Sequence, residues 1–328
     1  LVHPPCNISL FVNIPLKYSH FNLSPMSNPM MATLTTAISP QGPYVGRFAP
    51  SPSGALHFGS LVAALGSYLR ARSEGGKWLI RVEDIDPPRE VAGAADDILR
   101  TLEAYGFEWD HTVLYQSART EAYQAKLDEL LAEDNAYFCQ CSRKQIQAIG
   151  GIYDGRCHRL ATPHHSGAVR LVNRAQVAEF TDNLMGKVIV DRAFAAEDFI
   201  IKRSDGLYAY QLAVVLDDAY QGITEVVRGY DLIEASCRQL SLYQTFGLTA
   251  PQWLHLPLAS LSPGFKLSKQ NHAQAIDKQH PQASLNAALA FLGQAPVELT
   301  TATQMLAQAV AQFQLSAIPK QREILIAP

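Results

Sequence analysis

The stretch FAPSPSGALHFGS, residues 48–60, decides the fold. It overlaps the short apolar run YVGRFAP, residues 44–50, and leads into LVAALGSYLRAR, residues 61–72, whose apolar residues recur at helical spacing. The Pro, Gly and Ser residues between them are typical of a turn, so the pattern predicts a buried strand, a tight turn and a helix. Such a turn presents backbone N–H groups to a phosphate, and His57 adds a possible donor. An ordinary strand-to-helix connection uses the same residue types.

A second strand with an acidic end is predicted at KWLIRVEDIDPPRE, residues 77–90. Its apolar residues give way to Glu83, Asp84 and Asp86 before two prolines end the run. Ligands of parallel sheets bind at the carboxyl ends of the strands, and buried carboxylates there are costly unless they meet a ligand or each other. A solvated acidic corner is the alternative, and it explains Asp86 more easily than Glu83.

Composition sets limits on the class of protein. The chain has 328 residues, of which 48% are hydrophobic and 17% charged, enough for a large core and for two or three domains. A formal net charge of -3 argues against general attraction to nucleic acid or to an anionic membrane, so an RNA partner would need a local basic surface. No apolar run is long enough to span a membrane. Five cysteines are too few for a disulfide framework, which favours a reducing, cytoplasmic compartment.

The first forty residues differ from the rest. They contain no Asp, Glu or Arg and are rich in Pro, Ser and Asn. Neither a secretory signal nor a mitochondrial presequence fits this composition. We expect residues 1–40 to be a disordered or non-native extension, with a physiological start at Met26, Met30 or Met31.

Two further buried strands are predicted at YQLAVVLDD, residues 210–218, and ITEVVRG, residues 223–229. The first ends in paired carboxylates, and the second ends at Arg228. An arginine side chain is suited to a bidentate grip on a carboxylate. The alternative for Arg228 is an ion pair with Asp231 or Glu225 at the sheet edge.

Three thiols lie close together in the sequence at Cys139, Cys141 and Cys157. In a chain without a disulfide framework, this grouping indicates a structural zinc site, which needs four ligands. From general chemistry, His158 is the obvious fourth ligand. Three unligated cysteines in a folded loop are the alternative.

A third motif completes a resemblance to a known family. KLSKQN, residues 266–271, carries two lysines that would pass for surface residues in isolation. Together, RFAPSPSGALHFGS, RVEDIDPPR and KLSKQN resemble, in this order, the signatures of class I aminoacyl-tRNA synthetases of the glutamyl branch. The resemblance implies an α/β fold with a Rossmann-like parallel sheet, and ATP as a substrate together with Mg²⁺.

The resemblance also implies roles for individual residues. It gives His57 and Lys269 as catalytic residues and Tyr153, in place of His158, as the fourth zinc ligand beside Cys139, Cys141 and Cys157. Ser60 stands where the family signature ends in histidine, which leaves it available as an N-cap of the helix. The implied ATP-binding residues are His57, Gly59, Ser60, Lys266 and Lys269. The implied glutamate-binding residues are Arg47, Phe48, Ala49, Pro50, Ser51, Glu83, Tyr210 and Arg228.

The expected domains follow the same resemblance. Residues 41–103 and 195–260 form the catalytic domain, and residues 104–194 form an inserted α+β subdomain with the zinc. Residues 261–328 hold the lysine loop and a short tail with two amphipathic helices, and no anticodon-binding domain is expected. RNA is expected to meet the insertion and the tail, where Arg143, Lys144, Arg156 and Arg159 supply local positive charge. Solvated surface charge is the alternative for all four.

The short C-terminal part makes the chain similar to truncated paralogues of glutamyl-tRNA synthetase. Members of that group activate L-glutamate with ATP without tRNA, and then transfer it to queuosine in the anticodon loop of tRNA(Asp). We therefore expect a cytoplasmic ligase, monomeric, with queuosine-containing tRNA(Asp) as its partner. The alternatives are a truncated synthetase that charges the 3′ end of a tRNA, a small-molecule nucleotidyltransferase and a non-catalytic binding module.

Overall fold

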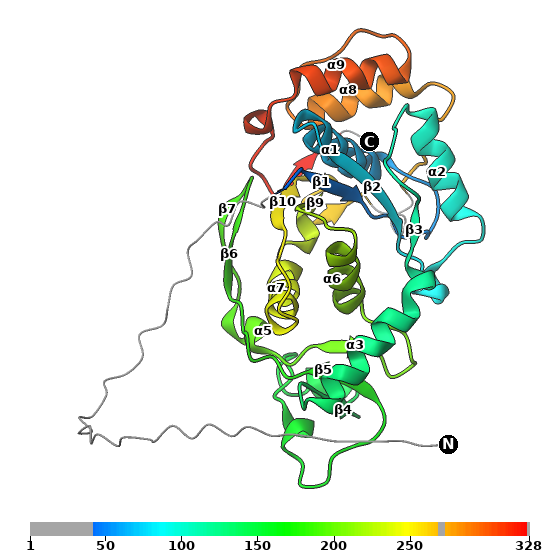
Figure 1. The fold of residues 1–328 in the computed structure, drawn as a ribbon. Helices are drawn as coiled ribbons and strands as arrows, with labels where there is room; N and C mark the ends of the chain where they lie inside the picture. Colours follow the sequence, from blue (N-terminus) through cyan, green and yellow to red (C-terminus); the bar gives the residue numbers. More distant parts are fainter. Residues whose placement is uncertain (1–41, 268–272, 327–328) are drawn as a thin grey trace, which may run out of the picture. The chain divides into compact units, whose positions relative to one another are not determined.

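The predicted strand, turn and helix around residues 48–60 are all present. In the computed structural model, β1 spans Val45–Phe48 and α1 spans Phe58–Ser73 (Figure 1). The structure describes residues 42–267 and 273–326, so the expected extension at residues 1–40 lies outside the described residues. The turn between β1 and α1 therefore stands at the carboxyl end of a strand, as the sequence indicates.

The central sheet is parallel. β2 (Lys77–Val82) pairs with β1 on one side and with β3 (Leu114–Tyr115) on the other. β9 (Glu225–Gly229) pairs with β10 (Gln252–Leu256), also in parallel. The backbone N–H of Thr224 donates to the carbonyl of Val45, 2.9 Å away, which places β9 beside β1. The strand order is thus β3, β2, β1, β9, β10, in agreement with a Rossmann-like fold.

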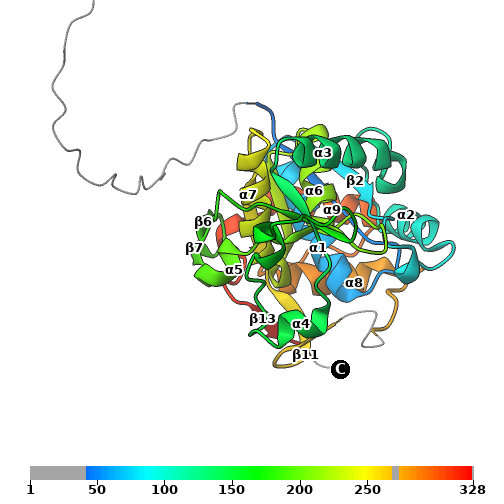
Figure 2. The same ribbon diagram turned by 90° about the horizontal axis from the view of Figure 1, so that it is seen from below.

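Helices cover both faces of this sheet (Figure 1). α1, α8 (Pro281–Phe291) and α9 (Ala302–Gln312) lie on one face, and α6 (Tyr210–Tyr220) and α7 (Ala235–Thr245) lie on the other. α6 and α7 run side by side in both views (Figure 2). Because both faces are buried, the strands are apolar along most of their length rather than alternating.

Strand periodicity sends a set of polar side chains to the α6 and α7 face. Leu79, Val226 and Trp253 belong to the core cluster on that face. Residues two positions further along each strand, or paired with them in register, face the same way. They are Arg47, opposite Leu79, together with Arg81, Arg228 and His255. The face that carries these side chains is the one against which α6 packs.

The strand predicted at residues 210–218 is wrong, because this segment is the helix α6. The run Leu212, Ala213, Val214 and Val215 is buried all round, since the helix lies between the sheet and its neighbours. A short apolar run of this kind does not separate a buried helix from a buried strand by periodicity. Asp217 and Asp218 are consequently buried inside the protein rather than placed at the mouth of a strand.

The segment between β3 and α6 forms the inserted part. An antiparallel sheet joins β4 (Ala136–Cys139), β5 (Ala168–Leu171) and β8 (Ile200–Lys202), and β6 (Glu179–Asp182) forms a hairpin with β7 (Gly186–Ile189). Its helices are α3 (Thr120–Ala132), α4 (Arg143–Gln147) and α5 (Arg192–Ala196). The central sheet itself reaches β3, beyond the expected boundary at residue 103, because β3 pairs with β2.

The C-terminal part contains the two expected helices, α8 and α9, and also a strand that the sequence did not indicate. β13 (Glu323–Leu325) pairs in parallel with β11 (Leu258–Ser262), which also pairs with β12 (Phe265–Lys266). α2 (Ala94–Ala104) joins the α1 face of the core. Among the helices of the described residues, none has both the length and the apolar character needed to cross a membrane.

Candidate active site

The turn after β1 is closed by His57, which is the N-cap of α1. Its Nδ1 accepts a hydrogen bond from the backbone N–H of Ser60, 3.3 Å away. The prediction that Ser60 is the N-cap is therefore wrong, because Ser60 lies in the first turn of α1 and supplies the N–H. Since Nδ1 accepts, Nε2 carries the ring proton of the neutral imidazole. The imidazole is thereby fixed at a helix N-terminus, the kind of place where phosphates bind.

A cleft of about 460 Å³ brings this turn together with the segment that begins the lysine signature. Its walls include His57 and Gly59 from the turn and Lys266 and Leu267 from the other segment. Lys266 forms an ion pair with Asp231, which lines the same cleft. Lys269, the predicted catalytic lysine, lies outside the described residues. Two motifs that are far apart in the sequence thus share one cleft.

The end of β1 and the end of β2 meet beside this cleft. Phe48, Pro50 and Ser51 line it, with Ala49 between them in the chain. The backbone N–H of Glu83 donates to the carbonyl of Pro50, 3.0 Å away. An adjoining cavity of about 310 Å³ is lined by Glu83 and shares Ser51 with the cleft. The acidic strand end therefore borders the same space as the turn.

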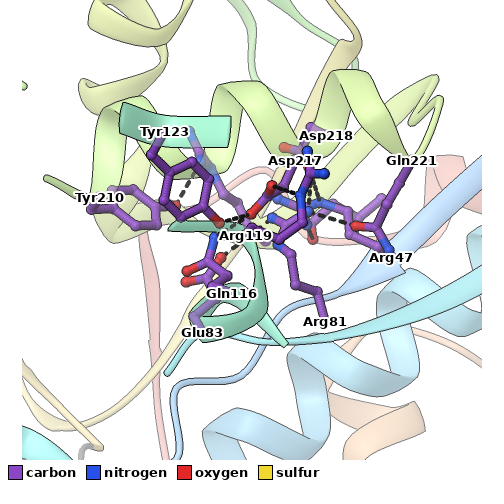
Figure 3. A network of polar contacts seen from close by, with 12 residues as sticks. Arg47, Arg81, Glu83, Gln116, Arg119, Tyr123, Tyr210, Asp217, Asp218 and Gln221 are labelled. Atoms are coloured by element: carbon purple, nitrogen blue, oxygen red, sulfur yellow. Dashed lines mark hydrogen bonds and ion pairs between the residues drawn. The ribbon is translucent and has the colours of Figure 1, made fainter. Parts of the chain in front are cut away.

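Asp218 of α6 is buried between two arginines of the sheet (Figure 3). Its Oδ1 lies 2.6 Å from Nη1 of Arg81 and 3.2 Å from Nε of Arg47. Burial alone would raise the pKa of Asp218, but the charges of Arg47 and Arg81 outweigh it and the pKa is lowered. The carboxylate is thus ionised, and it is a counter-charge for both arginines.

Two further carboxylates complete this buried network. Asp217 accepts hydrogen bonds from Nε of Arg119, 3.1 Å away, and from Nε2 of Gln116, 2.9 Å away. Oε1 of Glu83 lies 3.3 Å from Nη2 of Arg81. Burial raises the pKa of Glu83, and the charge of Arg81 opposes that shift. Three arginines, at positions 47, 81 and 119, therefore meet three carboxylates, at positions 83, 217 and 218.

Arg228 is also buried, but its partners are different. Its Nε donates to Nε2 of His255, 3.0 Å away, and its Nη1 donates to the hydroxyl of Tyr210, 3.1 Å away. Its Nη2 donates to Oγ of Ser236, at 2.8 Å, and to the carbonyl of Leu232, at 3.2 Å. In the part of the chain that the structure describes, Arg228 makes no ion pair with a carboxylate. Its buried positive charge is therefore not matched by an adjacent anion.

The alternative that Arg228 pairs with Asp231 or Glu225 is wrong. Asp231 pairs with Lys266, and Glu225 pairs with Arg70, with 2.8 Å between its Oε2 and the arginine Nε. Arg228 faces the α6 and α7 side of the sheet. The acidic residues that are close to Arg228 in the sequence are therefore not its partners in the folded protein.

Tyr210 is near both the charge network around Asp218 and the separately bonded Arg228. Burial raises the pKa of its hydroxyl, the positive charges of Arg228 and Arg47 oppose that shift, and the negative charge of Glu83 adds to it. These side chains are therefore close enough to act on one another. The predicted glutamate-binding residues Arg47, Glu83, Tyr210 and Arg228 come together on one face of the sheet, although α6, which carries Tyr210, was predicted to be a strand.

The three predicted thiols cluster in the inserted part. The sulfur atoms of Cys139, Cys141 and Cys157 lie within 4.8 Å of one another, and those of Cys141 and Cys157 are 3.5 Å apart. The hydroxyl of Tyr153 accepts a hydrogen bond from the backbone N–H of Cys157, 2.8 Å away. This arrangement of soft sulfur donors fits a zinc ion.

His158 lies apart from the thiol cluster. Its ring stacks on that of Tyr137, with 4.8 Å between the ring centroids, and the metal-ligand cluster found in the described residues contains no histidine. By contrast, the thiols of Cys139 and Cys157 are among the groups that raise the pKa of Tyr153, after burial as the largest cause. Of the two candidates for the fourth ligand, Tyr153 has the printed contact with the cluster, through the backbone N–H of Cys157.

Sequence reasoning did not find four polar residues that hold this site together. They are Arg81, Asp182, Asp218 and His255, all buried. Arg81 and His255 each interrupt an apolar strand, and a charged or polar residue in such a run is a signal of a buried partner. Their partners are distant in sequence, so the signal does not say what the partner is.

Comparison with known proteins defines the class. The family model for the catalytic domain of class I tRNA synthetases (E and Q) matches residues 44–304. Among solved structures, glutamate–tRNA synthetase from Elizabethkingia anophelis superimposes with a TM-score of 0.72 at 23% identity, over 87% of this chain and 68% of that one. At that identity the structural match bears on the fold only. The chain is a class I aminoacyl-tRNA synthetase of the glutamate and glutamine branch, and hence a ligase.

Close relatives define the particular family. A glutamyl-Q tRNA(Asp) synthetase from Shewanella oneidensis is 89% identical over 90% of this chain and 99% of its own length. The relative of that name from Escherichia coli K12 is 55% identical over 84% of this chain and 91% of its own. The chain belongs to the family of glutamyl-Q tRNA(Asp) synthetases.

The buried network predicts a large cost for removing its central carboxylate. Asp218→Asn leaves two buried arginines without their shared counter-charge, so we expect the free energy of unfolding to fall by about 3–5 kcal/mol. Chemical denaturation at pH 7 measures the change. Asp205→Asn is the matched control, because Asp205 forms an exposed pair with Arg203 and its loss should leave the free energy of unfolding nearly unchanged.

The pH dependence of this difference has a definite sign. Because the pKa of Asp218 is lowered by folding, its contribution to stability is present above the unfolded pKa of about 3.9 and is lost as the pH falls through the lower folded pKa. The difference in the free energy of unfolding between wild type and Asp218→Asn should therefore be constant from about pH 5 to pH 8 and become smaller in more acidic solution. A gap that grows below pH 4 would contradict this assignment of charge.

Proposed function

We propose that this chain activates L-glutamate with ATP, without tRNA, and then transfers the glutamyl group to queuosine in the anticodon loop of tRNA(Asp). Activation forms a bond between a glutamate carboxylate oxygen and the α-phosphorus of ATP and releases pyrophosphate. Transfer then releases AMP. The observation that carries the proposal is Arg228, a buried cation beside the cleft whose partners in the described residues are all uncharged.

A buried cation of this kind is a receptor for an anion. Burial of a charge without a counter-charge is costly, and burial lowers the pKa of Arg228, whose own partners are hydroxyl, carbonyl and imidazole groups. The side-chain carboxylate of glutamate would supply the missing negative charge. Arg47 differs, because Asp218 already pairs with it. Its hydrogen bonds use Nε and one N–H of Nη1, which leaves the second N–H of Nη1 and both of Nη2 as donors for the substrate.

The other end of the amino acid needs acceptors for its ammonium group. Glu83 borders the cavity next to the cleft. The hydroxyl of Tyr210 contacts Nη1 of Arg228, and the charge of Glu83 contributes to its raised pKa. Both can accept a hydrogen bond from an ammonium group. The chain from Phe48 to Ser51 would then form the wall along which the substrate lies, with its α-carboxylate directed towards the cleft.

ATP would occupy the cleft between the two signatures. Attack on the α-phosphorus needs little covalent help, so positioning and stabilisation of negative charge account for most of the catalysis. His57 and the backbone of Gly59 and Ser60 stand at the N-terminus of α1, and Lys266 lines the same cleft. We assign the phosphates to these groups and to Lys269, and expect Mg²⁺ to accompany ATP.

The acceptor is inferred from the relatives. The two quoted above carry the name glutamyl-Q tRNA(Asp) synthetase, and at 89% identity this chain is expected to share their reaction. A cytoplasmic monomer remains our expectation, because tRNA is a cytoplasmic substrate and one chain supplies every residue assigned here.

The direct test follows labelled glutamate into tRNA. We expect label in tRNA(Asp) that contains queuosine, and none in the same tRNA without queuosine or in tRNA(Glu). Glutamate-dependent exchange between ATP and pyrophosphate is expected in the absence of any tRNA. Charging of tRNA(Glu), or transfer that ignores queuosine, would favour the truncated glutamyl-tRNA synthetase, and absence of exchange would favour a non-catalytic module.

We expect a side chain at position 59 to disturb the turn that we assign to ATP. A Cβ atom at this position would lie 3.2 Å from Cε1 and 3.3 Å from Nδ1 of His57, against the imidazole ring. Gly59→Val should therefore abolish pyrophosphate exchange, with a melting temperature within a few degrees of wild type, and Gly59→Ala should lose less. Retention of exchange in Gly59→Val would show that the turn does not hold the nucleotide.

The thiol cluster is proposed as the structural zinc site, with Cys139, Cys141, Cys157 and Tyr153 as ligands. Metal analysis of the purified protein should find one zinc per chain. Tyr153→Phe removes only the hydroxyl and should lower zinc occupancy, while the matched change His158→Ala should leave it unchanged. Full zinc occupancy in Tyr153→Phe would eliminate Tyr153 as a ligand, and loss in His158→Ala alone would assign the fourth place to histidine.

A further inference from the structure

A line of buried hydrogen bonds runs from the β6–β7 hairpin to Arg228. Oδ2 of Asp182 lies 2.7 Å from Nδ1 of His255, and Nε2 of His255 lies 3.0 Å from Nε of Arg228. The side chains of Asp182 and His255 are fully buried. His255 contacts Arg228, and Asp182 contacts His255. Neither residue lines the cleft or the adjoining cavity. Asp182 and His255 can therefore affect substrate binding only through the position of Arg228.

The geometry fixes the tautomer of His255. The guanidinium of Arg228 is always protonated, so its Nε donates and Nε2 of the imidazole must accept. The ring proton is then on Nδ1, where the Asp182 carboxylate accepts it. Burial is the main reason that the pKa of His255 is lowered to about 4, which keeps the ring neutral at physiological pH. A single protonation state thus satisfies both hydrogen bonds.

Asp182 is itself held in one orientation. Its Oδ1 accepts hydrogen bonds from the backbone N–H groups of Leu184, 3.0 Å away, and Met185, 2.8 Å away, in the turn of the hairpin. This leaves Oδ2 for the imidazole. The hairpin turn therefore decides which oxygen of the carboxylate meets His255.

The same contacts decide which donor of Arg228 can reach a substrate. Arginine has five N–H donors, and four of those of Arg228 are used by His255, Tyr210, Ser236 and Leu232. The remaining N–H is on Nη1, the nitrogen that also contacts Tyr210. The guanidinium is thereby held at its Nε and Nη2 and offers Nη1 alone.

We propose that Asp182 and His255 are positioning residues for glutamate recognition, which hold Arg228 so that Nη1 faces the substrate carboxylate. The inference rests on the proposed glutamate site. An imidazole between Asp182 and Arg228 has a clear advantage over direct contact. A carboxylate paired with the guanidinium would neutralise it, as Asp218 does for Arg47, and would occupy donors; the imidazole aligns the arginine and leaves its charge for the substrate.

Asp182→Asn tests this through the tautomer. The backbone N–H groups of Leu184 and Met185 require an acceptor, so they should hold the amide oxygen and turn the amide NH₂ towards Nδ1 of His255. Nδ1 must then accept, which moves the ring proton to Nε2 and against the N–H of Arg228. An Asp→Asn change beside a catalytic histidine can impose the wrong tautomer in this way.

We expect KM for glutamate in pyrophosphate exchange to rise roughly 10- to 100-fold, the range for loss of a hydrogen bond to a charged group. KM for ATP should stay within about twofold of wild type, because Arg228 does not line the cleft assigned to ATP. Glu179→Gln is the matched control: it removes the same charge from the same strand, but Glu179 is exposed and pairs with Lys187. It should leave both KM values unchanged.

A glutamate KM within twofold of wild type in folded Asp182→Asn would overturn the inference, as would a parallel rise in KM for ATP. Lack of exchange by the wild-type protein would instead refute the proposed function.

A second measurement applies even if the variant does not fold. Ring ¹⁵N shifts of histidine-labelled wild type, with His255 assigned by its absence in His255→Gln, should show His255 neutral with its proton on Nδ1. A proton on Nε2, or a charged ring, would also overturn the inference.

Discussion

Burial of positive charge beneath a parallel sheet is the constraint on which the rest of this structure depends. Alternation along β1, β2 and β9 sends Arg47, Arg81 and Arg228 to the face covered by α6 and α7, where water cannot solvate them. Such charges persist only with partners. Asp218 of α6 supplies the partner for the first two, so one helical residue ties the helix to two strands.

Arg228 is the exception, and the function follows from it. The protein surrounds it with neutral acceptors and, among the described residues, uses only one of the two N–H groups of Nη1, the one that contacts Tyr210. An amino acid with a carboxylate side chain would complete the charge balance, and the adjoining cleft would hold the nucleotide with which it reacts. Binding of glutamate would therefore supply the one negative charge that the buried arginines still lack in the folded protein.

Local sequence patterns predict part of the fold and of the site, and contacts between residues distant in sequence determine the rest. The β1 strand, the turn and α1 could be predicted from residues 44–72, because Pro, Gly and Ser separate two apolar patterns. α6 could not, because its apolar run at residues 212–215 is buried all round and shows no helical period. The partnership of Arg81 with Asp218 was equally hidden, since only the fold brings these residues together. The residue type of Ser60 fits an N-cap, whereas His57 is the residue that accepts the capping hydrogen bond.

A crystal structure with bound L-glutamate would test the central claim most directly. The account predicts the side-chain carboxylate at Nη1 of Arg228, about 3 Å away, with Asp218 still paired to Arg47 and Arg81. His255 should remain between Asp182 and Arg228. A glutamate whose side-chain carboxylate pairs with Arg47 after displacing Asp218, or one that leaves Arg228 without an anion, would contradict the account.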